Sequence, residues 1–434
     1  MSTIEKLPNS ISELKTSAEV STESRGCRFC NHPIENLVAD LGLSPLCQSQ
    51  IEHDKLNHPE VFYPLRAFVC DKCLLVQVHE HVAGEEIFSH YAYFSSFSDS
   101  WLQHCKDYSE MIIERLHLNC ESFVVEVASN DGYMLQNFVE KNVPCLGIEP
   151  ATNVAEVARK KNIDVMNRFF GVQTAQDAVK EYGKADLVMA NNVLAHVPDL
   201  NDFVGGLHTI LSDTGTLTVE FPHLKNLMEL NQFDTIYQEH YCYFSVLTLE
   251  KVFKHHGMQI YDVEKIPTHG GSLRIYVKQQ INSDLEVRDS VSKIITEEKD
   301  AGLGDVNYYG RLQDAANSVK YQLLEFLIRA KRDGKTVCGY GAPGKGNTLL
   351  NFCGIREDLL PFTVDRNTFK QGSFLVGSRI PVYAPEAIEQ LQPDYVLILP
   401  WNLKDEICEQ LSYVKNWGAK LVVPIPELTV MESK

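Results

Sequence analysis

One stretch constrains the fold more than any other, residues 124–150, VVEVASNDGYMLQNFVEKNVPCLGIEP. Its β-branched start predicts a buried strand, which is followed by a polar turn, a helix and a second strand that stops at Glu149. Such a turn places backbone N–H groups at the start of a helix. An acidic residue at the end of the second strand can accept hydrogen bonds from a ribose. The stretch therefore predicts half of a nucleotide site.

The alternation of strand and helix continues beyond this stretch and predicts a parallel sheet with helices on both faces. Strands are expected at 124–128, 145–149, 163–167, 185–191 and 215–221, and helices at 132–141, 152–161, 174–181 and 200–211. A helix near 247–256 and a strand pair at 258–266 and 272–279 would close the sheet with an antiparallel edge strand. Residues 282–333 are helical by pattern, with one apolar face made of Leu312, Ala316, Val319, Leu323 and Leu327.

A second α/β unit follows, with strands expected at 336–340, 362–365, 394–399 and 420–424. Its first strand leads into GYGAPGKGN at 339–347, which meets the GxGxxG template, and Asp365 ends the next strand. The loop also nearly meets the P-loop template, but Gly346 stands where Ser or Thr would bind Mg²⁺, which argues against nucleotide hydrolysis. We expect a bound phosphate or pyrophosphate, with Lys345 as a point charge. The alternative is a glycine turn needed only for packing.

The first turn has different chemistry, because it contains one glycine. A dinucleotide pyrophosphate needs several glycines for close approach of the backbone. S-adenosylmethionine (SAM) has no phosphate, and its ammonium group favours acidic and carbonyl partners. SAM therefore fits this turn better than NAD. The candidate cofactor-binding residues are Glu126, Ala128, Ser129, Asn130, Asp131, Gly132, Glu149, Asn191 and Asn192.

Two CxxC pairs predict a zinc site of four sulfurs, which would be closed and structural. The ligands are Cys27, Cys30, Cys70 and Cys73. No secretory signal is visible at the N-terminus, so the twelve cysteines are expected to be reduced and the protein cytoplasmic. Three nearby residues could replace one ligand, namely Cys47, His79 and His81.

Two stretches bring reactive side chains to the carboxyl edge of the first sheet, where ligands bind. They are residues 191–197, NNVLAHV, and 237–243, YQEHYCY. His196 alone is more often a structural residue. In the second stretch, Glu239, His240 and the tyrosines together can orient an imidazole, remove a proton and donate to an oxyanion. No GxSxG or HExxH motif is present, which excludes a serine hydrolase and a zinc protease of those types.

The net charge limits the possible partners, and the chain length sets a minimum number of domains. The net charge of −18 argues against nucleic acid or an anionic membrane as a partner, and no apolar run could span a bilayer. We expect a monomer or weak oligomer. At 434 residues the chain needs several domains. The expected division is a tail at 1–24, a zinc-binding domain at 25–95, a methyltransferase domain at 96–282 and a Rossmann-like domain at 283–434.

Taken together, these motifs carry a resemblance. The CxxC pairs, VEVASNDG with GIEP, ANNVLAHVPD, YQEHYCYFS, and GYGAPGKGN with VDRN at 364–367 resemble the zinc-containing, SAM-dependent sugar C-methyltransferases of deoxysugar biosynthesis. The resemblance covers nearly all of residues 25–430. It implies a class I methyltransferase domain between a zinc lobe and a second Rossmann-like domain. It further implies SAM and zinc as cofactors and a nucleotide-linked 4-keto-6-deoxy sugar that is methylated at C3.

The resemblance also implies roles for individual residues. His240 would be the base, Tyr237 or His196 would stabilise an enolate oxygen, and Glu239 would orient the histidine or bind the sugar. The aromatic run at 90–101 suits either interface packing or a sugar pocket, and by resemblance Tyr91 or Tyr93 would close the pocket. The residues expected to bind the nucleotide diphosphate are Gly341, Gly344, Lys345, Asn347 and Asp365.

The sequence departs from the family pattern at two positions. Ala128 stands where glycine is usual, a change expected to be harmless, and Gln238 stands where a second histidine is usual. Two other functions stay open. One is an NAD-dependent nucleotide-sugar oxidoreductase, with the cofactor on the second glycine loop and Asp365. The other is a non-catalytic zinc-lobe adaptor with a degenerate SAM fold.

Overall fold

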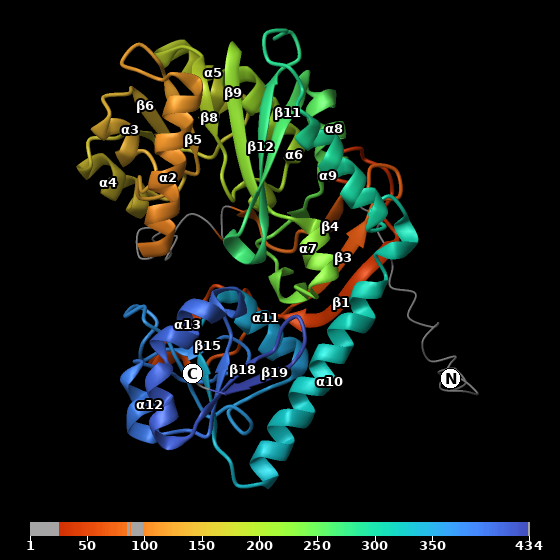
Figure 1. Cartoon of the computed structure of the whole chain (residues 1–434), viewed down its shortest axis with the longest axis vertical. Helices are drawn as coiled ribbons and strands as arrows, with labels where there is room; N and C mark the ends of the chain where they lie inside the picture. Colours follow the sequence, from red (N-terminus) through yellow and green to blue (C-terminus); the bar gives the residue numbers. More distant parts are fainter. Residues whose placement is uncertain (1–25, 85–86, 88–98, 433–434) are drawn as a thin grey trace, which may run out of the picture.

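The computed structural model describes residues 26–84, 87 and 99–432. Two α/β lobes are stacked one above the other, and the long helix α10 (Arg311–Arg332) runs beside the lower lobe toward the upper one (Figure 1). The strands of the N-terminal lobe lie where the two α/β lobes meet. Among the described helices, none is long and apolar enough to cross a membrane.

The upper lobe is built on a seven-stranded sheet in the order β11-β12-β9-β8-β5-β6-β7. The strands are β5 (Val124–Val127), β6 (Cys145–Ile148), β7 (Asp164–Met166), β8 (Ala185–Met189), β9 (Leu211–Pro222), β11 (Met258–Ile266) and β12 (Ser272–Gln279). Strands β5 to β9 run parallel, and β12 is antiparallel to both β9 and β11. This is the class I methyltransferase sheet. The predicted hairpin is present, but its antiparallel strand lies inside the sheet and β11 forms the edge.

The helices of the upper lobe include the five that were predicted. They are α2 (Asp99–Leu116), α3 (Gln136–Glu140), α4 (Thr152–Lys160), α5 (Val172–Tyr182), α6 (Leu200–Ile210), α7 (Leu224–Glu229) and α8 (Val246–His255), of which α2 and α7 are additional. Side-chain caps start two of them, because Asp199 accepts from the N–H of Asp202 and Ser245 from that of Thr248. Helix α3 is shorter than predicted, since the turn before it continues to residue 135.

The lower lobe contains a smaller sheet in the order β16-β14-β13-β17-β18-β19, parallel except for β19. Its elements are β13 (Val337–Tyr340), α11 (Gly344–Cys353), β14 (Thr363–Val364), β15 (Phe374–Leu375), β16 (Val382–Tyr383), α12 (Glu386–Leu391), β17 (Tyr395–Ile398), α13 (Lys404–Gln410), β18 (Lys420–Val423) and β19 (Thr429–Glu432). Helices α9 (Asp289–Asp300) and α10 lead into it. The predicted apolar face of α10 is buried.

The N-terminal lobe shares its sheets with both other lobes. Strands β1 (Asn36–Ser44), β3 (Tyr63–Val69) and β4 (Val76–Val78) form a sheet that is completed by β10 (Cys242–Tyr243). Strand β2 (Gln50–Ile51) pairs with β15 of the lower lobe. The hydrophobic core is equally continuous, and one cluster includes Leu65 of β3, Leu224 of α7 and Leu323 of α10.

Candidate active site

The turn after β5 is held in an unusual backbone conformation. The φ angles of Ala128, Asn130 and Gly132 are 58°, 50° and 74°. Glycine is favoured at position 132 by its φ of 74°, and a Cβ there would also lie 2.4 Å from Cδ1 of Ile163 and 3.1 Å from Cβ of Ala158. Alanine in the left-handed region costs about 1–2 kcal/mol. Ala128, which stands where glycine is usual, therefore carries this energetic cost. The expectation that the change is harmless to function stays a prediction.

Glu149, at the end of β6, holds this turn from the neighbouring strand. Its Oε2 accepts a hydrogen bond from the N–H of Asn130 at 2.9 Å, and its Oε1 accepts one from the N–H of Ala151 at 2.8 Å. Burial raises the pKa of this carboxyl group. Each carboxylate oxygen can accept more than one hydrogen bond. Glu149 can therefore stabilise the turn and still accept a ribose hydroxyl.

Several buried polar atoms around the turn have no hydrogen-bond partner within the described residues. They are Oε2 of Glu126, Oγ of Ser129 and both amide atoms of Asn191 and Asn192. Burial raises the pKa of Glu126 well above its ordinary value, and Glu149 and Asp131 add to the shift. Since folded proteins leave few such atoms unsatisfied, this group indicates a polar ligand. A concentration of carboxyl groups suits the ammonium and sulfonium of SAM.

His240 has the geometry of a general base. Its Nδ1 lies 2.9 Å from the carbonyl oxygen of Thr235, which can only accept, so Nδ1 carries the proton. Its Nε2 lies 2.8 Å from the hydroxyl of Tyr237. Burial, with smaller contributions from His196, His269 and Lys345, lowers the pKa of His240 well below its ordinary value. The imidazole is therefore neutral at pH 7, with Nε2 free of a proton.

His196 and Glu239 complete this group. The ring of His196 packs edge-on against that of His240 with centroids 4.7 Å apart, and its Nδ1 donates to the carbonyl oxygen of Glu239 at 2.9 Å. Burial lowers the pKa of His196 to about 4. Burial also raises the pKa of Glu239 to about 8, although a backbone hydrogen bond from Gln48 opposes the shift. Glu239 is thus a protonated acid at neutral pH and can donate a hydrogen bond.

Gln238, the second departure from the family pattern, is directed away from these histidines. Its Nε2 makes long contacts of 3.4 Å and 3.5 Å with the carbonyl oxygens of Ser44 and Tyr63 in the N-terminal lobe. The side chain is buried. It therefore joins the segment 237–243 to the N-terminal lobe.

Lys345 of the second glycine loop faces the upper lobe. It donates to Oδ1 of Asn402 and lies 4.5 Å from the ring centroid of Trp401. The indole N–H of Trp401 donates to Oδ2 of the buried Asp234 at 2.7 Å. Burial lowers the pKa of Lys345 to about 8 and raises that of Asp234 to about 7. The loop thus brings a cation to the junction of the two α/β lobes, near the candidate catalytic residue His240.

The start of α11, which the glycine motif predicted as a phosphate site, is covered by the N-terminal lobe. A Cβ on Gly344 would lie 2.8 Å from Nε2 of Gln48 and 3.0 Å from Sγ of Cys47. The amide of Asn347 donates to the carbonyl oxygen of Cys47 at 2.6 Å. Asp365 accepts from the N–H of Ala342 at 2.7 Å and so braces the loop. Gly341, at φ 88°, makes the bend.

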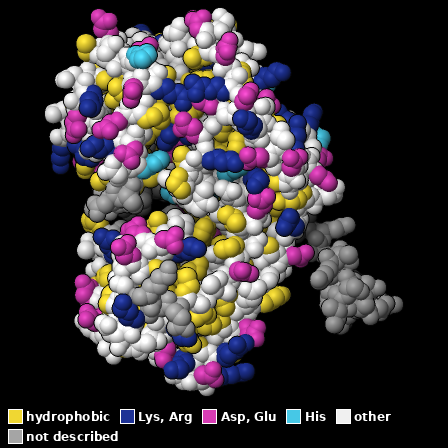
Figure 2. Space-filling model, viewed as in Figure 1, with side chains coloured by type: hydrophobic (Ala, Val, Ile, Leu, Met, Phe, Trp, Pro, Cys, Tyr) yellow, Lys and Arg dark blue, Asp and Glu magenta, His cyan; other side chains and the backbone are white. Residues whose placement is uncertain are grey.

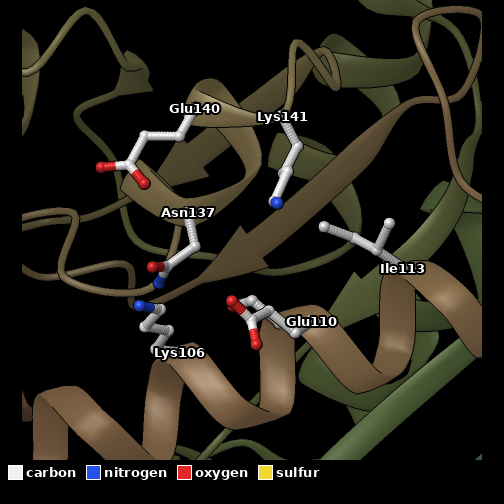
Figure 3. A pocket seen from close by; sticks show the side chains of 7 residues that line it. Lys106, Glu110, Ile113, Asn137, Glu140 and Lys141 are labelled. Atoms are coloured by element: carbon white, nitrogen blue, oxygen red, sulfur yellow. The ribbon is translucent and has the colours of Figure 1, made fainter.

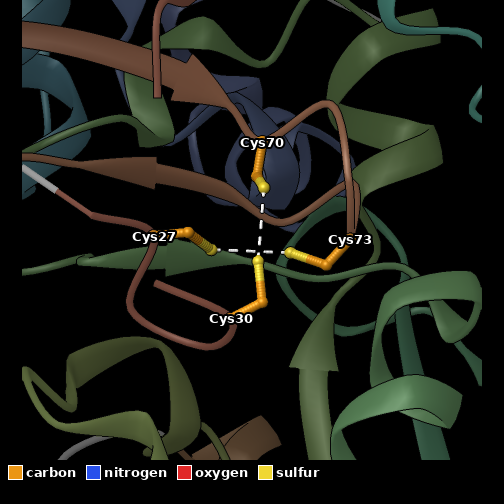
Figure 4. A group of neighbouring side chains, drawn as sticks. All are labelled: Cys27, Cys30, Cys70 and Cys73. Carbon is orange, nitrogen blue, oxygen red and sulfur yellow. Dashed lines mark hydrogen bonds between the residues drawn. The ribbon is translucent and has the colours of Figure 1, made fainter. Parts of the chain in front are cut away.

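The four predicted zinc ligands converge (Figure 4). The sulfur atoms of Cys27, Cys30, Cys70 and Cys73 all lie within 4.8 Å of one another. A hydrogen bond with Cys73 lowers the pKa of Cys27 to about 5, and Gln77 Nε2 also donates to the Cys27 sulfur at 3.2 Å. Four sulfurs at this spacing fit a tetrahedral zinc ion with no open position. The site is therefore structural.

The structure brings the predicted SAM-binding and catalytic residues together in two groups. The SAM candidates lie around the carboxyl ends of β5, β6 and β8, and the catalytic candidates lie beside them, after β8 and in the segment before β10. Tyr91 and Tyr93 lie outside the described residues. The molecular surface is hollowed between the two α/β lobes (Figure 2).

Sequence reasoning missed Asp234 and Trp401 at this junction. Trp401 follows the carboxyl end of β17, so the rule applied to the first sheet could have found it. Asp234 lies in a segment with no periodic pattern and gave no signal. Cys47 and Gln48 were also missed as neighbours of the second loop, because that contact joins segments about 300 residues apart.

A separate surface pocket lies between α2 and α3 (Figure 3). It is small, about 140 Å³. The residues that line it are Lys106, Ser109, Glu110, Ile113, Asn137, Glu140 and Lys141. Both signs of charge are present, and none of the catalytic candidates contributes to it. The pocket is therefore separate from the candidate active site.

Three family models match the chain. Residues 27–88 match a "Putative zinc binding domain", residues 106–263 a methyltransferase domain and residues 267–426 a C-methyltransferase C-terminal domain. C-methyltransferase NovU of Streptomyces niveus is 34% identical over 408 residues, which cover 94% of this chain and 97% of NovU.

Solved methyltransferase structures align with part of the chain. The 1,6-didemethyltoxoflavin-N1-methyltransferase of Burkholderia thailandensis is 13% identical with a TM-score of 0.34, over 47% of this chain and 94% of its own. The magnesium protoporphyrin IX methyltransferase of Synechocystis PCC 6803 is 14% identical with a TM-score of 0.31, over 41% of this chain and 81% of its own.

Proposed function

This chain belongs to the zinc-containing, SAM-dependent C-methyltransferases, and we propose that it methylates C3 of a nucleotide-diphosphate-linked 4-keto-6-deoxy sugar. The observation that carries the proposal is the contact between Nε2 of His240 and the hydroxyl of Tyr237, beside a turn suited to SAM. A ketone at C4 acidifies the proton on C3. Removal of that proton needs a neutral base and a donor for the developing oxyanion, and these two side chains supply both.

The proposed reaction assigns each step to a residue. His240 Nε2 removes the C3 proton, and the electron pair of the C–H bond moves through C4 onto the ketone oxygen. The hydroxyl of Tyr237 would donate a hydrogen bond to that oxygen, because the single N–H of the neutral His196 already donates to the carbonyl oxygen of Glu239. The oxygen pair would then re-form the C4 ketone while the C3=C4 electron pair bonds C3 to a methyl group. SAM, when bound, would supply that methyl group, and the C–S electron pair would stay with sulfur. His240 finally releases its proton to solvent.

The residues proposed to hold SAM are those of the first turn and its neighbours. Glu149 would accept the ribose hydroxyls, Asn191 and Asn192 would face the sulfonium end, and the remaining contacts come from Glu126, Ala128, Ser129, Asn130, Asp131 and Gly132. The buried polar atoms without partners among the described residues support this assignment.

For the sugar nucleotide, we propose Lys345 as a direct contact to the diphosphate. Lys345 lies close enough to lower the pKa of both His240 and His269, which supports a place beside the reacting sugar. The other predicted residues, Gly341, Gly344, Asn347 and Asp365, would shape the loop that carries it. Glu239, as a protonated acid, would donate to a sugar oxygen.

The test is exchange of the C3 proton in D₂O, measured by NMR on 4-keto-6-deoxy sugars linked to deoxythymidine, guanosine and cytidine diphosphates. His240→Ala should lose exchange and methylation by about 10²- to 10⁴-fold and keep its affinity for SAM. His208→Ala, a histidine of α6, is the matched control. Unchanged turnover in His240→Ala would remove this histidine from the mechanism.

Two alternatives predict different results. An NAD-dependent oxidoreductase would be stabilised against heat by NAD and not by SAM. The cover that Cys47 and Gln48 place over the start of α11 does not favour NAD there. An adaptor without catalysis would exchange no C3 proton on any sugar nucleotide of the panel.

A further inference from the structure

Arg28 reaches from the metal site to both segments that carry catalytic histidines. It lies between Cys27 and Cys30, and its side chain is only 12% exposed. Its Nη1 donates to the carbonyl oxygen of Pro198 at 2.6 Å. Its guanidinium carbon lies 4.8 Å from the ring centroid of Tyr241. One guanidinium therefore contacts two segments of the upper lobe.

These two contacts lie next to the catalytic residues in the chain. Pro198 is the second residue after His196, and Tyr241 directly follows His240. The two histidine rings are in edge-on contact, with centroids 4.7 Å apart. A shift of either segment would change this contact.

The backbone of Arg28 is held in place by hydrogen bonds beside the four cysteines. Its backbone N–H donates to Oε1 of Gln77 at 2.9 Å, and Nε2 of the same glutamine donates to the Cys27 sulfur. Gln77 lies opposite Cys242 in the β4–β10 pairing. Asn201 donates to the Arg28 carbonyl oxygen at 3.2 Å. The backbone is therefore held on both sides.

We propose that Arg28 is a positioning residue for the reaction, which holds the segments of His196 and His240 in register. Gln77 and Asn201 meanwhile fix the backbone of Arg28 beside the four cysteines. The inference rests on the proposed function for the catalytic role of the histidines. Zinc, when bound by the four cysteines, would support catalysis in this way without contact to the substrate. A misplacement of about 1 Å at a reacting group can cost up to about 100-fold in rate.

Arginine is suited to this role because its planar fork makes several directed contacts at once. Besides its contact with Pro198, Arg28 donates from Nη2 to the carbonyl oxygen of Val78 at 3.2 Å, and its Nη1 lies 3.6 Å from Oε2 of Glu80. Lysine would keep the charge and lose the fork. Methionine would keep most of the volume and lose both.

The experiment compares Arg28→Met and Arg28→Lys with Arg66→Met as the matched control. Arg66 lies in the same lobe and pairs with Asp40 at 2.8 Å. The readout is the long-range ¹H–¹⁵N spectrum of the histidine side chains with SAM bound, in which His196→Gln and His240→Gln assign the signals. Zinc content and the Kd for SAM are measured on each variant.

Arg28→Met is expected to shift the signals of His196 and His240 and to lower kcat about 10- to 100-fold, with full zinc and an unchanged Kd for SAM. Arg28→Lys should shift the same signals and lower kcat, both by less. If Arg28→Met loses zinc, the result for Arg28→Lys decides whether the proposal stands. Unshifted signals in a zinc-loaded variant would overturn the proposal. The histidine spectrum reports whether Arg28 positions the two segments even if His240→Ala keeps its turnover. Failure of the proposed base and failure of the positioning role are therefore distinguishable.

Discussion

The chain contains two glycine turns that each lead from a buried strand into a helix, and the two turns have different surroundings. The turn at 128–132 lies among buried polar atoms that have no partner within the described chain. The turn at 341–346 is packed against Cys47 and Gln48. A glycine motif thus specifies a backbone conformation. What the turn contacts depends on which distant segment folds over it, so function must be argued from the assembled site.

The two turns also share a feature, which makes the difference informative. Each is braced by an acidic residue from the end of the next strand, since Glu149 accepts from the N–H of Asn130 and Asp365 from that of Ala342. The acids are equivalent in bracing, but among the described residues Glu149 lies beside the larger group of buried polar atoms without a hydrogen-bond partner, whereas the second turn is followed by two, Oδ1 of Asn347 and Oγ1 of Thr348. Substitution of each acid therefore separates bracing from binding.

The largest effect is expected from that pair of substitutions. Glu149→Ala should weaken SAM binding about 100-fold, because it removes the proposed ribose acceptor and one brace of the turn. Asp365→Ala should leave the Kd for SAM unchanged. Calorimetric titration with SAM measures both. Equal losses of SAM affinity in the two variants would contradict the proposed difference between the turns.

A smaller effect is expected where the second turn is covered. Gly344→Ala places a methyl group against Gln48 and Cys47 and should lower the free energy of unfolding by about 1–2 kcal/mol without changing the Kd for SAM. Urea denaturation measures the change. Gly310→Ala is the control, since a Cβ there meets nothing within 4 Å. An unchanged stability in Gly344→Ala would mean that the cover is loosely packed.

A further effect, measured per pH unit, concerns the stability at Glu239, to which Gln48 of the same cover donates. Its pKa rises from 4.5 to about 8 in the folded protein, so the folded state keeps a proton that the unfolded chain releases. The resulting stabilisation is complete below pH 4.5 and is lost as the pH rises to 8. Asp234, with a pKa of about 7, acts in the same direction.

Glu239→Gln should therefore flatten the dependence of stability on pH by up to about 1 kcal/mol per pH unit within this window. Thermal unfolding between pH 5 and 8 checks it, with the exposed Glu325→Gln as control. A slope equal to that of the wild type would show that Glu239 is ionised in the folded protein.

Much of the fold could be predicted because it is encoded locally. The strands at 258–266 and 272–279 match their predicted bounds, and the apolar stripe of α10 is buried as its 3.6-residue period indicated. The CxxC pairs predicted the four-sulfur group, since each pair fixes two ligands within one turn. These features depend on neighbours in sequence.

The relations between lobes could not be predicted, because they depend on contacts between distant segments. Nothing local in Cys242–Tyr243 indicates a partner in β4, and nothing local in Gln50–Ile51 indicates one in β15. Trp401 and Asp234 likewise become neighbours only after both α/β lobes are assembled. The resemblance implied the chemistry of His240, whereas the role proposed for Arg28 required the coordinates.

The shared strand β10 has a consequence for how the protein is made. Strands β1, β3 and β4 leave the ribosome well before residues 242–243, and β15, the partner of β2, emerges later still. During that interval the N-terminal lobe has open strand edges, which favour pairing with other chains. All four cysteines are already present, however, so zinc can bind early and hold the nascent lobe together. A chain that stopped before residue 242 would keep every metal ligand and still lack the last strand of this sheet.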